Sequence, residues 1–444
     1  MKKHISRIIA AMLALALISG VSGCSIRSPD ELYSLPRLSN ENLQLQNLLA
    51  EEIASGSEYS APASGSYRQS VQMYDIDNDG VNEALAFFKS SDQMPKICVY
   101  RQEQGKYVLA ATVLGDGGFI GSVEYAEMDP ESGAELIVTW QNNSGMKILN
   151  VYSMKNYSMS VLLTTDCTAF HVADLDSDGL QELLCIKADT LVANSQTGEV
   201  TLYKLSHDGE MTFSSAALSP GITSVSRVRS TSLSDGIPAV FVESLWGEGG
   251  TVTDVFVLRG SDIKNISPDP HSGESRTVRS YVVYAQDIDG NKTLNIPSAK
   301  LLPKARDSST AYWVYDWYDL DINGRMSKVM STYHCASDGW YLVLNDALRQ
   351  NLTVRRVDSG SGERTVVLSS IDPGTQKVTD LLTIYTLTGE NRRDRANTGE
   401  RFVLHEEDAT IYAALINSEE LSMTQTDVIA AFNLIYAEWN TGAL

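Results

Sequence analysis

Short runs in which apolar and polar residues alternate recur along most of the chain, separated by turns rich in aspartate and glycine. Alternation with a period of two predicts β-strands that bury one face. Four stretches share one order: a strand, an acidic loop, a second strand and a hairpin of two more. First strands are predicted at 70–74, 122–126, 168–172 and 224–228, second strands at 83–88, 135–140, 182–186 and 239–242, and hairpins at 96–113, 146–163, 199–217 and 251–266.

The spacing of the acidic loops, roughly fifty residues, is the length of a four-stranded propeller blade. Such a unit cannot bury both faces alone, so units must stack. A fifth unit is predicted to begin with a strand at 279–284, to continue through a degraded loop at 287–291 and to close with a hairpin over 312–333. The prediction is a mainly β protein with a propeller of about five blades over residues 66–336.

A further acidic stretch, 319–324, looks like another cation loop but lies inside the hairpin of the fifth unit. Asn323-Gly324 is a dipeptide that favours the left-handed backbone of a hairpin turn. We interpret this stretch as a turn.

The pattern changes from residue 338 onward, where strands come without acidic loops. One helix follows, with Thr424 and Asp427 as a capping box and Val428, Ala431, Ile435 and Trp439 on one face. This predicts a small α+β domain over 337–444 that ends in a helix. The alternative is two further blades that close a seven-bladed ring. The six strands are expected at 340–344, 352–356, 365–368, 381–386, 401–404 and 410–414.

The first 65 residues are organised differently. A positive start, an apolar run over 8–18 and then Val21-Ser22-Gly23-Cys24 indicate a secretory signal that is too short to span a membrane. Residues 1–23 resemble a bacterial lipoprotein signal, which implies cleavage before Cys24 and diacylation (palmitate) of its sulfur. An ordinary signal peptide is the alternative. The resemblance implies an extracytoplasmic protein that is lipid-anchored to the bacterial cell membrane.

Residues 24–65 are expected to form the lipidated tether, which contains one helix. Leu45, Leu48, Leu49 and Ile53 form one apolar stripe on that helix. A stripe of this kind should dock on the body of the protein.

The formal net charge is −21 and 43% of the residues are hydrophobic. The charge argues against a nucleic-acid partner, because phosphate binding needs the opposite sign. Cys98 and Cys185 lie in apolar strands and are expected to be buried thiols rather than disulfide partners.

The acidic loop is complete in two places, Asp75–Glu83 and Asp174–Glu182. Carboxylates stand at positions 1, 3, 5 and 9, glycine at 6, and a backbone carbonyl is available at 7. Oxygen ligands in this number suit a hard cation such as calcium. The alternative is a solvated turn. An EF-hand is excluded, because Ala86 and Cys185 stand where a bidentate glutamate would be required.

These units resemble the FG-GAP/VCBS repeats of integrin-like β-propellers, and the chain looks like a bacterial VCBS-repeat lipoprotein. The resemblance covers about residues 70–333 and implies a structural calcium ion in each complete loop. In the second unit Pro130 and Ser132 depart from the pattern, and the fourth keeps only Asp235-Gly236. The implied ligands are Asp75, Asp77, Asp79, the carbonyl of Val81 and Glu83, and likewise Asp174, Asp176, Asp178, the carbonyl of Leu180 and Glu182.

No catalytic motif is recognisable in the sequence. We therefore favour a calcium-stabilised binding or scaffold module for an extracellular glycan or protein, with Trp246 in a rim loop as a candidate ligand contact. The alternative is an extracytoplasmic polysaccharide-active hydrolase or lyase with its site in the propeller funnel.

Overall fold

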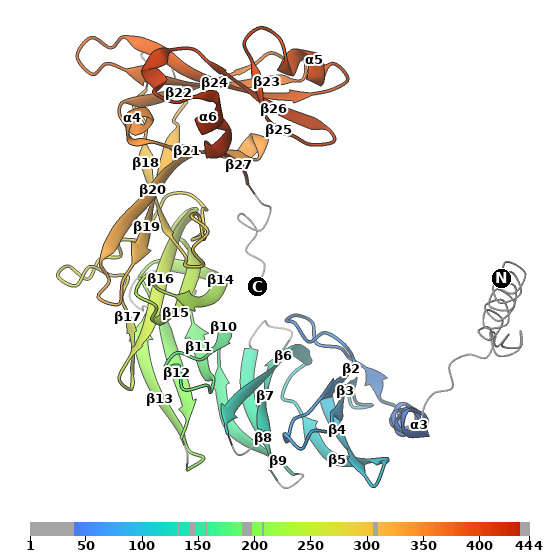
Figure 1. Cartoon of the computed structure of the whole chain (residues 1–444). Coiled ribbons are helices and arrows are strands. Elements are labelled where there is room, and N and C mark those ends of the chain that lie inside the picture. The colour runs from blue at the N-terminus through green and yellow to red at the C-terminus, as the bar shows by residue number, and fades with distance from the viewer. Residues whose placement is uncertain are drawn as a thin grey trace, which may run out of the picture.

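The structure is a computed structural model, and it describes residues 40–130, 133–142, 147–155, 158–188, 198–206, 208–304 and 310–435. These residues form six antiparallel sheets of four or five strands. The sheets follow one another along an open arc, with the first and sixth sheets at its ends (Figure 1). The protein is therefore mainly β, as predicted. Cys24, the signal segment, the tether up to residue 39 and Trp439 lie outside the described residues.

The first four sheets confirm the four predicted units. Each runs in chain order from the first strand to the fourth, and β1 (Glu58–Tyr59) adds a short fifth strand beside β3. The strands are β2 (Val71–Tyr74), β3 (Glu83–Lys89), β4 (Pro95–Glu103) and β5 (Lys106–Leu114); β6 (Phe119–Asp129), β7 (Gly133–Gln141), β8 (Lys147–Lys155) and β9 (Ser158–Asp166); β10 (Ala169–Ala173), β11 (Glu182–Lys187), β12 (Glu199–Leu205) and β13 (Met211–Ala217); and β14 (Ile222–Ser232), β15 (Pro238–Trp246), β16 (Gly250–Arg259) and β17 (Asp262–Asn265).

The hydrophobic cores lie between consecutive sheets. Leu85 and Val99 of the first sheet pack with Val123 and Val138 of the second, and all four are fully buried. Similar clusters join the second sheet to the third, the third to the fourth and the fourth to the fifth. Each sheet thus buries its faces against its neighbours, which is the physical reason for the repeat.

The helix α3 (Asn40–Ala54) packs on the first sheet, as its apolar stripe predicted. Leu45 and Leu49 are buried against Phe88 and Tyr100. Ile53, by contrast, is 39% exposed. The helix therefore belongs to the folded body.

The fifth sheet contains β18 (Ile296–Leu301), β19 (Trp313–Leu320), β20 (Met326–Cys335), β21 (Trp340–Leu344) and β27 (Phe432–Leu434). Its hairpin turns at Asp321, whose carbonyl accepts a hydrogen bond from Gly324 (2.8 Å), so the turn interpretation is confirmed. The predicted strand at 279–284 is wrong. Arg279 instead pairs its backbone with Thr251 of the fourth sheet.

The sixth sheet has the order β22 (Leu352–Asp358), β23 (Glu363–Ile371), β24 (Val378–Thr388), β26 (Thr410–Ile416) and β25 (Phe402–Glu406). The predicted strand at 340–344 exists as β21 but pairs with β20 of the fifth sheet. Three short helices accompany these sheets: α4 (Asp346–Arg349), α5 (Arg392–Ala396) and α6 (Gln425–Ala431).

The capping box of Thr424 and Asp427 is present at the start of α6. The helix ends at Ala431, earlier than predicted, because Phe432 to Leu434 continue as β27 and pair with β21. Ile435 donates its backbone N–H to Gly339 rather than lying on a helical face. No helix among the described residues is long and apolar enough to cross a membrane.

The described cysteines Cys98, Cys167, Cys185 and Cys335 are buried and unpaired with one another. Burial raises the pKa of the Cys167 thiol to about 11. The expectation of buried thiols for Cys98 and Cys185 is confirmed.

Candidate metal loops and the adjoining groove

The two complete acidic loops join the first and second strands of the first and third sheets. In both, the carboxylate of the first aspartate accepts hydrogen bonds from the backbone of the loop. Asp75 accepts backbone N–H groups of Asp79 (3.1 Å) and Gly80 (2.9 Å). In the third sheet Asp174 accepts the N–H of Gly179 (3.1 Å).

The fourth and sixth positions of both loops are left-handed. Asn78 and Ser177 have φ of 58° and 62°, and the glycines two residues later have φ of 87° and 89°. Glycine adopts this conformation without steric cost, which explains its place in the motif.

The ninth residue of each loop fixes the loop to the strand that follows it. Glu83 accepts the N–H of Ile76 (3.1 Å), and Glu182 accepts that of Leu175 (2.8 Å). Both glutamates are buried, at 1% and 0% exposure. Each loop therefore brings one buried carboxylate under its backbone.

Positions 1, 3 and 9 converge in both loops. Asp75, Asp77 and Glu83 each offer an oxygen within 4.8 Å of the others, and so do Asp174, Asp176 and Glu182. Within the described part of the chain, Asp77 Oδ1 and Asp174 Oδ1 are buried and have no hydrogen-bond partner. Buried carboxylate oxygens without hydrogen-bond partners are ligands of the kind that calcium prefers, so these residues fit the ion.

Positions 5 and 7 have a different role in the loops. Asp79 and Asp178 each accept the N–H of the residue two positions on, Val81 and Leu180, at 2.8 Å. The convergent groups contain neither of these aspartates. Their contribution to metal binding, and that of the two carbonyls, stays a prediction.

Negative charge accumulates in the first loop. Burial, together with the charges of Asp77, Asp79 and Asp75, raises the pKa of Glu83 to about 7. Burial and the charge of Asp79 also raise the pKa of Asp77. A bound divalent cation would reverse both shifts, because it favours the ionised forms.

The complete loop of the third sheet, Asp174–Glu182 (the third loop), differs from that of the first sheet, because Lys204 of β12 lies among its carboxylates. The ammonium contacts Asp176, the Oδ2 of Asp178 (2.8 Å) and the Oε1 of Glu182 (3.3 Å). Burial alone would lower the pKa of Lys204, but its hydrogen bonds to Asp176 and Asp178 raise it. The hydrogen bond from Lys204 in turn lowers the pKa of Asp178.

Two of the incomplete loops keep the same ninth-position bond. Glu135 accepts the N–H of Met128 (3.0 Å) in the second sheet, and Asn295 accepts that of Ile288 (3.0 Å) before the fifth. Asn295 is the ninth residue when Asp287 is counted as the first, so this position could have been identified from the sequence. The fourth loop is a tight turn closed by Gly236, as predicted.

Loops of neighbouring sheets touch one another. Ala134 donates to the carbonyl of Ile76 (3.1 Å), and Gln181 donates to that of Glu127 (2.7 Å). Between these loops lies a cavity of about 50 Å³, lined by Asp75, Glu127 and Asp129 among others. This cavity has room for an ion or a water molecule but not for an organic ligand.

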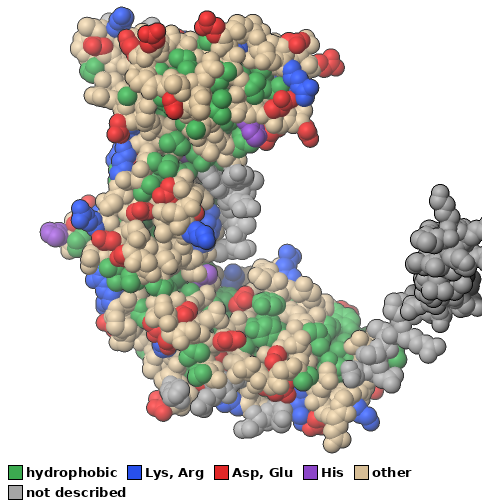
Figure 2. Space-filling view, viewed as in Figure 1, with side chains coloured by type: hydrophobic (Ala, Val, Ile, Leu, Met, Phe, Trp, Pro, Cys, Tyr) green, Lys and Arg blue, Asp and Glu red, His purple; other side chains and the backbone are tan. Residues whose placement is uncertain are grey.

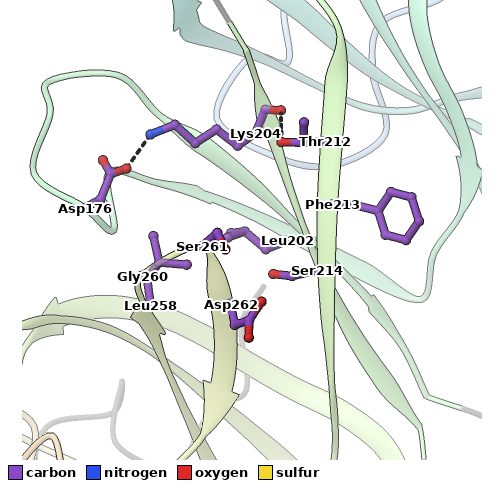
Figure 3. A pocket seen from close by; sticks show the side chains of 10 residues that line it. All are labelled: Asp176, Leu202, Lys204, Thr212, Phe213, Ser214, Leu258, Gly260, Ser261 and Asp262. Atoms are coloured by element: carbon purple, nitrogen blue, oxygen red, sulfur yellow. Dashed lines mark hydrogen bonds and ion pairs between the residues drawn. The ribbon is translucent and has the colours of Figure 1, made fainter.

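A larger groove of about 490 Å³ lies between the third and fourth sheets (Figure 3). Lys204, Thr212 and Ser214 line one side, and Asp262 lines the other. The ring of Phe213 points away from the other labelled side chains, and it is 73% exposed. Elsewhere on the visible face, acidic side chains are scattered over the whole arc (Figure 2).

Trp246 stands at the end of β15 and is half-buried. Its indole N–H donates to the carbonyl of Pro220 (2.9 Å), and its ring lies beside Gly221 and Gly250. The loop that carries it turns at Gly247 and Gly249. A ligand contact by Trp246 stays a prediction.

No known protein family matches the sequence, and no curated protein matches it either. Among solved structures, Saccharomyces cerevisiae Sqt1 is similar with a TM-score of 0.30 and 11% identity over 71% of this chain and 79% of that one. The periplasmic gluconolactonase PpgL of Pseudomonas aeruginosa has a TM-score of 0.28 and 12% identity over 74% and 95%. The exotype rhamnogalacturonan lyase YesX has a TM-score of 0.28 and 14% identity over 71% and 61%. These scores are too low to support an argument about activity.

Proposed function

We propose that this protein is a calcium-stabilised, propeller-like binding or scaffold module of the FG-GAP/VCBS type, held at the outer face of a bacterial membrane by lipid on Cys24. The observation that carries the calcium part is the convergence of three carboxylates in each complete loop, with a buried glutamate in both. Calcium would stabilise the loops by neutralising charges that otherwise repel one another.

Melting of the full chain in millimolar calcium and in chelator tests this part. Extracellular calcium modules bind at about 10⁻⁴ to 10⁻³ M, so this range is appropriate. An unchanged melting temperature would contradict calcium binding.

The position of the loop carboxylates favours binding over catalysis. Burial raises the pKa values of Glu83, Glu182 and Asp77, and all three carboxylates belong to the acidic loops. The groove between the third and fourth sheets, about 490 Å³ in volume, has the size of a ligand site. The proposed ligand is an extracellular glycan or protein.

Binding to glycan and envelope-protein arrays tests this part. The soluble fragment should begin at residue 40, because α3 packs on the first sheet. Trp246→Ala is expected to lower affinity, and Tyr59→Ala, which removes an exposed aromatic ring from the first sheet, is the matched control. A variant that binds as the parent does would remove Trp246 from the site.

The anchor is tested separately. Cys24→Ala should abolish metabolic labelling with palmitate and release the protein from the membrane fraction. An unmodified mature start at another residue, seen by mass spectrometry, would rule out the lipid.

A further inference from the structure

The two complete loops have the same motif but different neighbours on the third strand of their sheets. Tyr203 of β12 is the Cα partner of Leu183, and Lys204 follows it beside Glu182. Tyr100 of β4 is the partner of Ala84, and Arg101 follows it in the same register. Arg101 forms an ion pair with Glu103, farther along its own strand.

The ammonium of Lys204 stands where a metal ion would be bound. It contacts Asp176 and Glu182, which are two of the three convergent carboxylates of that loop. Glu182 is fully buried, and its Oε1 lies 3.3 Å from the Lys204 ammonium. Asp174 and Asp176 each offer an oxygen within 4.8 Å of the Glu182 carboxylate, so the ammonium lies at a cluster of three carboxylates. A divalent ion and an ammonium cannot share these oxygens, because like charges a few ångströms apart repel strongly at a partly buried site.

We propose that Lys204 is an internal counter-ion of the third loop, so that a divalent cation binds the first loop directly and binds the third loop only by displacing the Lys204 ammonium. This inference rests on the proposed function, in which the loops bind calcium. It predicts different calcium affinities for the first and third loops, although the two loops have the same sequence motif.

The groove beside the third loop can receive the displaced side chain. Lys204 already lines it together with Thr212, Ser214 and Asp262 (Figure 3). Metal binding in the third loop would therefore release one positive charge from a carboxylate cluster into this groove. An anionic ligand in that groove and calcium in the loop would then favour each other's binding.

Calorimetric titration of the full chain in detergent with calcium tests the proposal. The wild type should show one stronger and one weaker site. Lys204→Met should strengthen the weaker site by about tenfold or more, because it removes a competing charge. Lys187→Met is the matched control, since Lys187 forms an exposed ion pair with Asp166 in the same sheet.

The variant Asp77→Asn, which disables the first loop, isolates the third loop. In that background Lys204→Met should convert weak binding into a single clear transition, and circular dichroism confirms that each variant is folded. Two equal sites in the wild type, or unchanged affinity in Lys204→Met, would overturn the Lys204 inference and leave the calcium function standing. Absence of calcium binding in every variant would overturn both.

Discussion

Each of the first four sheets has a first strand before its acidic loop, whereas the fifth sheet does not. In the third sheet, β10 pairs with β11 over all of Ala169–Ala173. Before the fifth sheet only one bridge remains, between Gln286 and Asn295. The segment in front of this bridge is attached instead to the fourth sheet by buried charges.

Glu243 of β15 is the centre of that attachment. It accepts hydrogen bonds from Arg227 (2.8 Å), from Arg279 (3.1 Å) and from the backbone N–H of Ala285 (2.5 Å). Burial lowers the pKa of the Arg279 guanidinium to about 10, and the charge of Glu243 opposes this shift. The segment that begins at Arg279 is thus held against the fourth sheet and does not form a strand of the fifth.

The largest effect is expected from Glu243→Ala. The change leaves Arg227 and Arg279, at 7% and 3% exposure, without their carboxylate. Removal of one partner from a buried ion pair costs about 3–5 kcal/mol. Denaturant unfolding measures this loss in the free energy of unfolding.

The exposed pair of Arg393 and Glu406 supplies the control for Glu243→Ala. Glu406→Ala should change stability by less than about 1 kcal/mol, because solvent screens surface pairs. Equal losses in the two variants would remove the distinction between the buried attachment and an ordinary surface pair.

A smaller effect on stability, the gain from calcium binding, should distinguish the loop of the first sheet from the loop before the fifth sheet. At a hundredfold excess over Kd, calcium should stabilise the protein by about 2.7 kcal/mol per site. Asp77→Asn should reduce this gain, whereas Asp287→Asn should leave it unchanged, because neutral Asn295 replaces the ninth-position glutamate there. Differential scanning calorimetry with and without chelator measures both. An equal reduction in the two variants would show that the incomplete loop also holds metal.

The smallest effect concerns the helix that returns the chain to the fifth sheet. Thr424→Ala removes the capping box of α6 and should cost about 1 kcal/mol. Gln425→Ala, at the neighbouring exposed position, is the control, and chemical denaturation resolves the two. If both variants unfold as the parent does, the cap contributes nothing to the C-terminal packing.

The four regular sheets could be predicted from sequence because alternation, loop and spacing repeat together. The pairing of β27 could not, since Val428, Ala431 and Ile435 repeat with the period of a helix across this segment. Only the pairing of Phe432 and Leu434 with Leu342 and Trp340 makes it a strand. Tertiary contacts override local preference in such short segments.

The candidate site was predictable in its loops but not in its surroundings. The motif identifies Glu83 and Glu182, and both prove to be buried beneath their loops. Lys204 carries no signal of its own in the sequence, because a lysine at the end of an alternating strand is usually solvated. Its position beside Glu182 depends on the register between β11 and β12.

The pairing of β21 with β27 has a consequence for the order of folding. The whole sixth sheet lies between these two strands in the chain, so the fifth sheet acquires its last strand only after the C-terminal segment has been synthesised. The first four sheets have local pairings and can form in succession as the chain emerges. A chain shortened before Phe432 would therefore retain its early sheets while β21 exposed an unpaired edge, which is a template for aggregation.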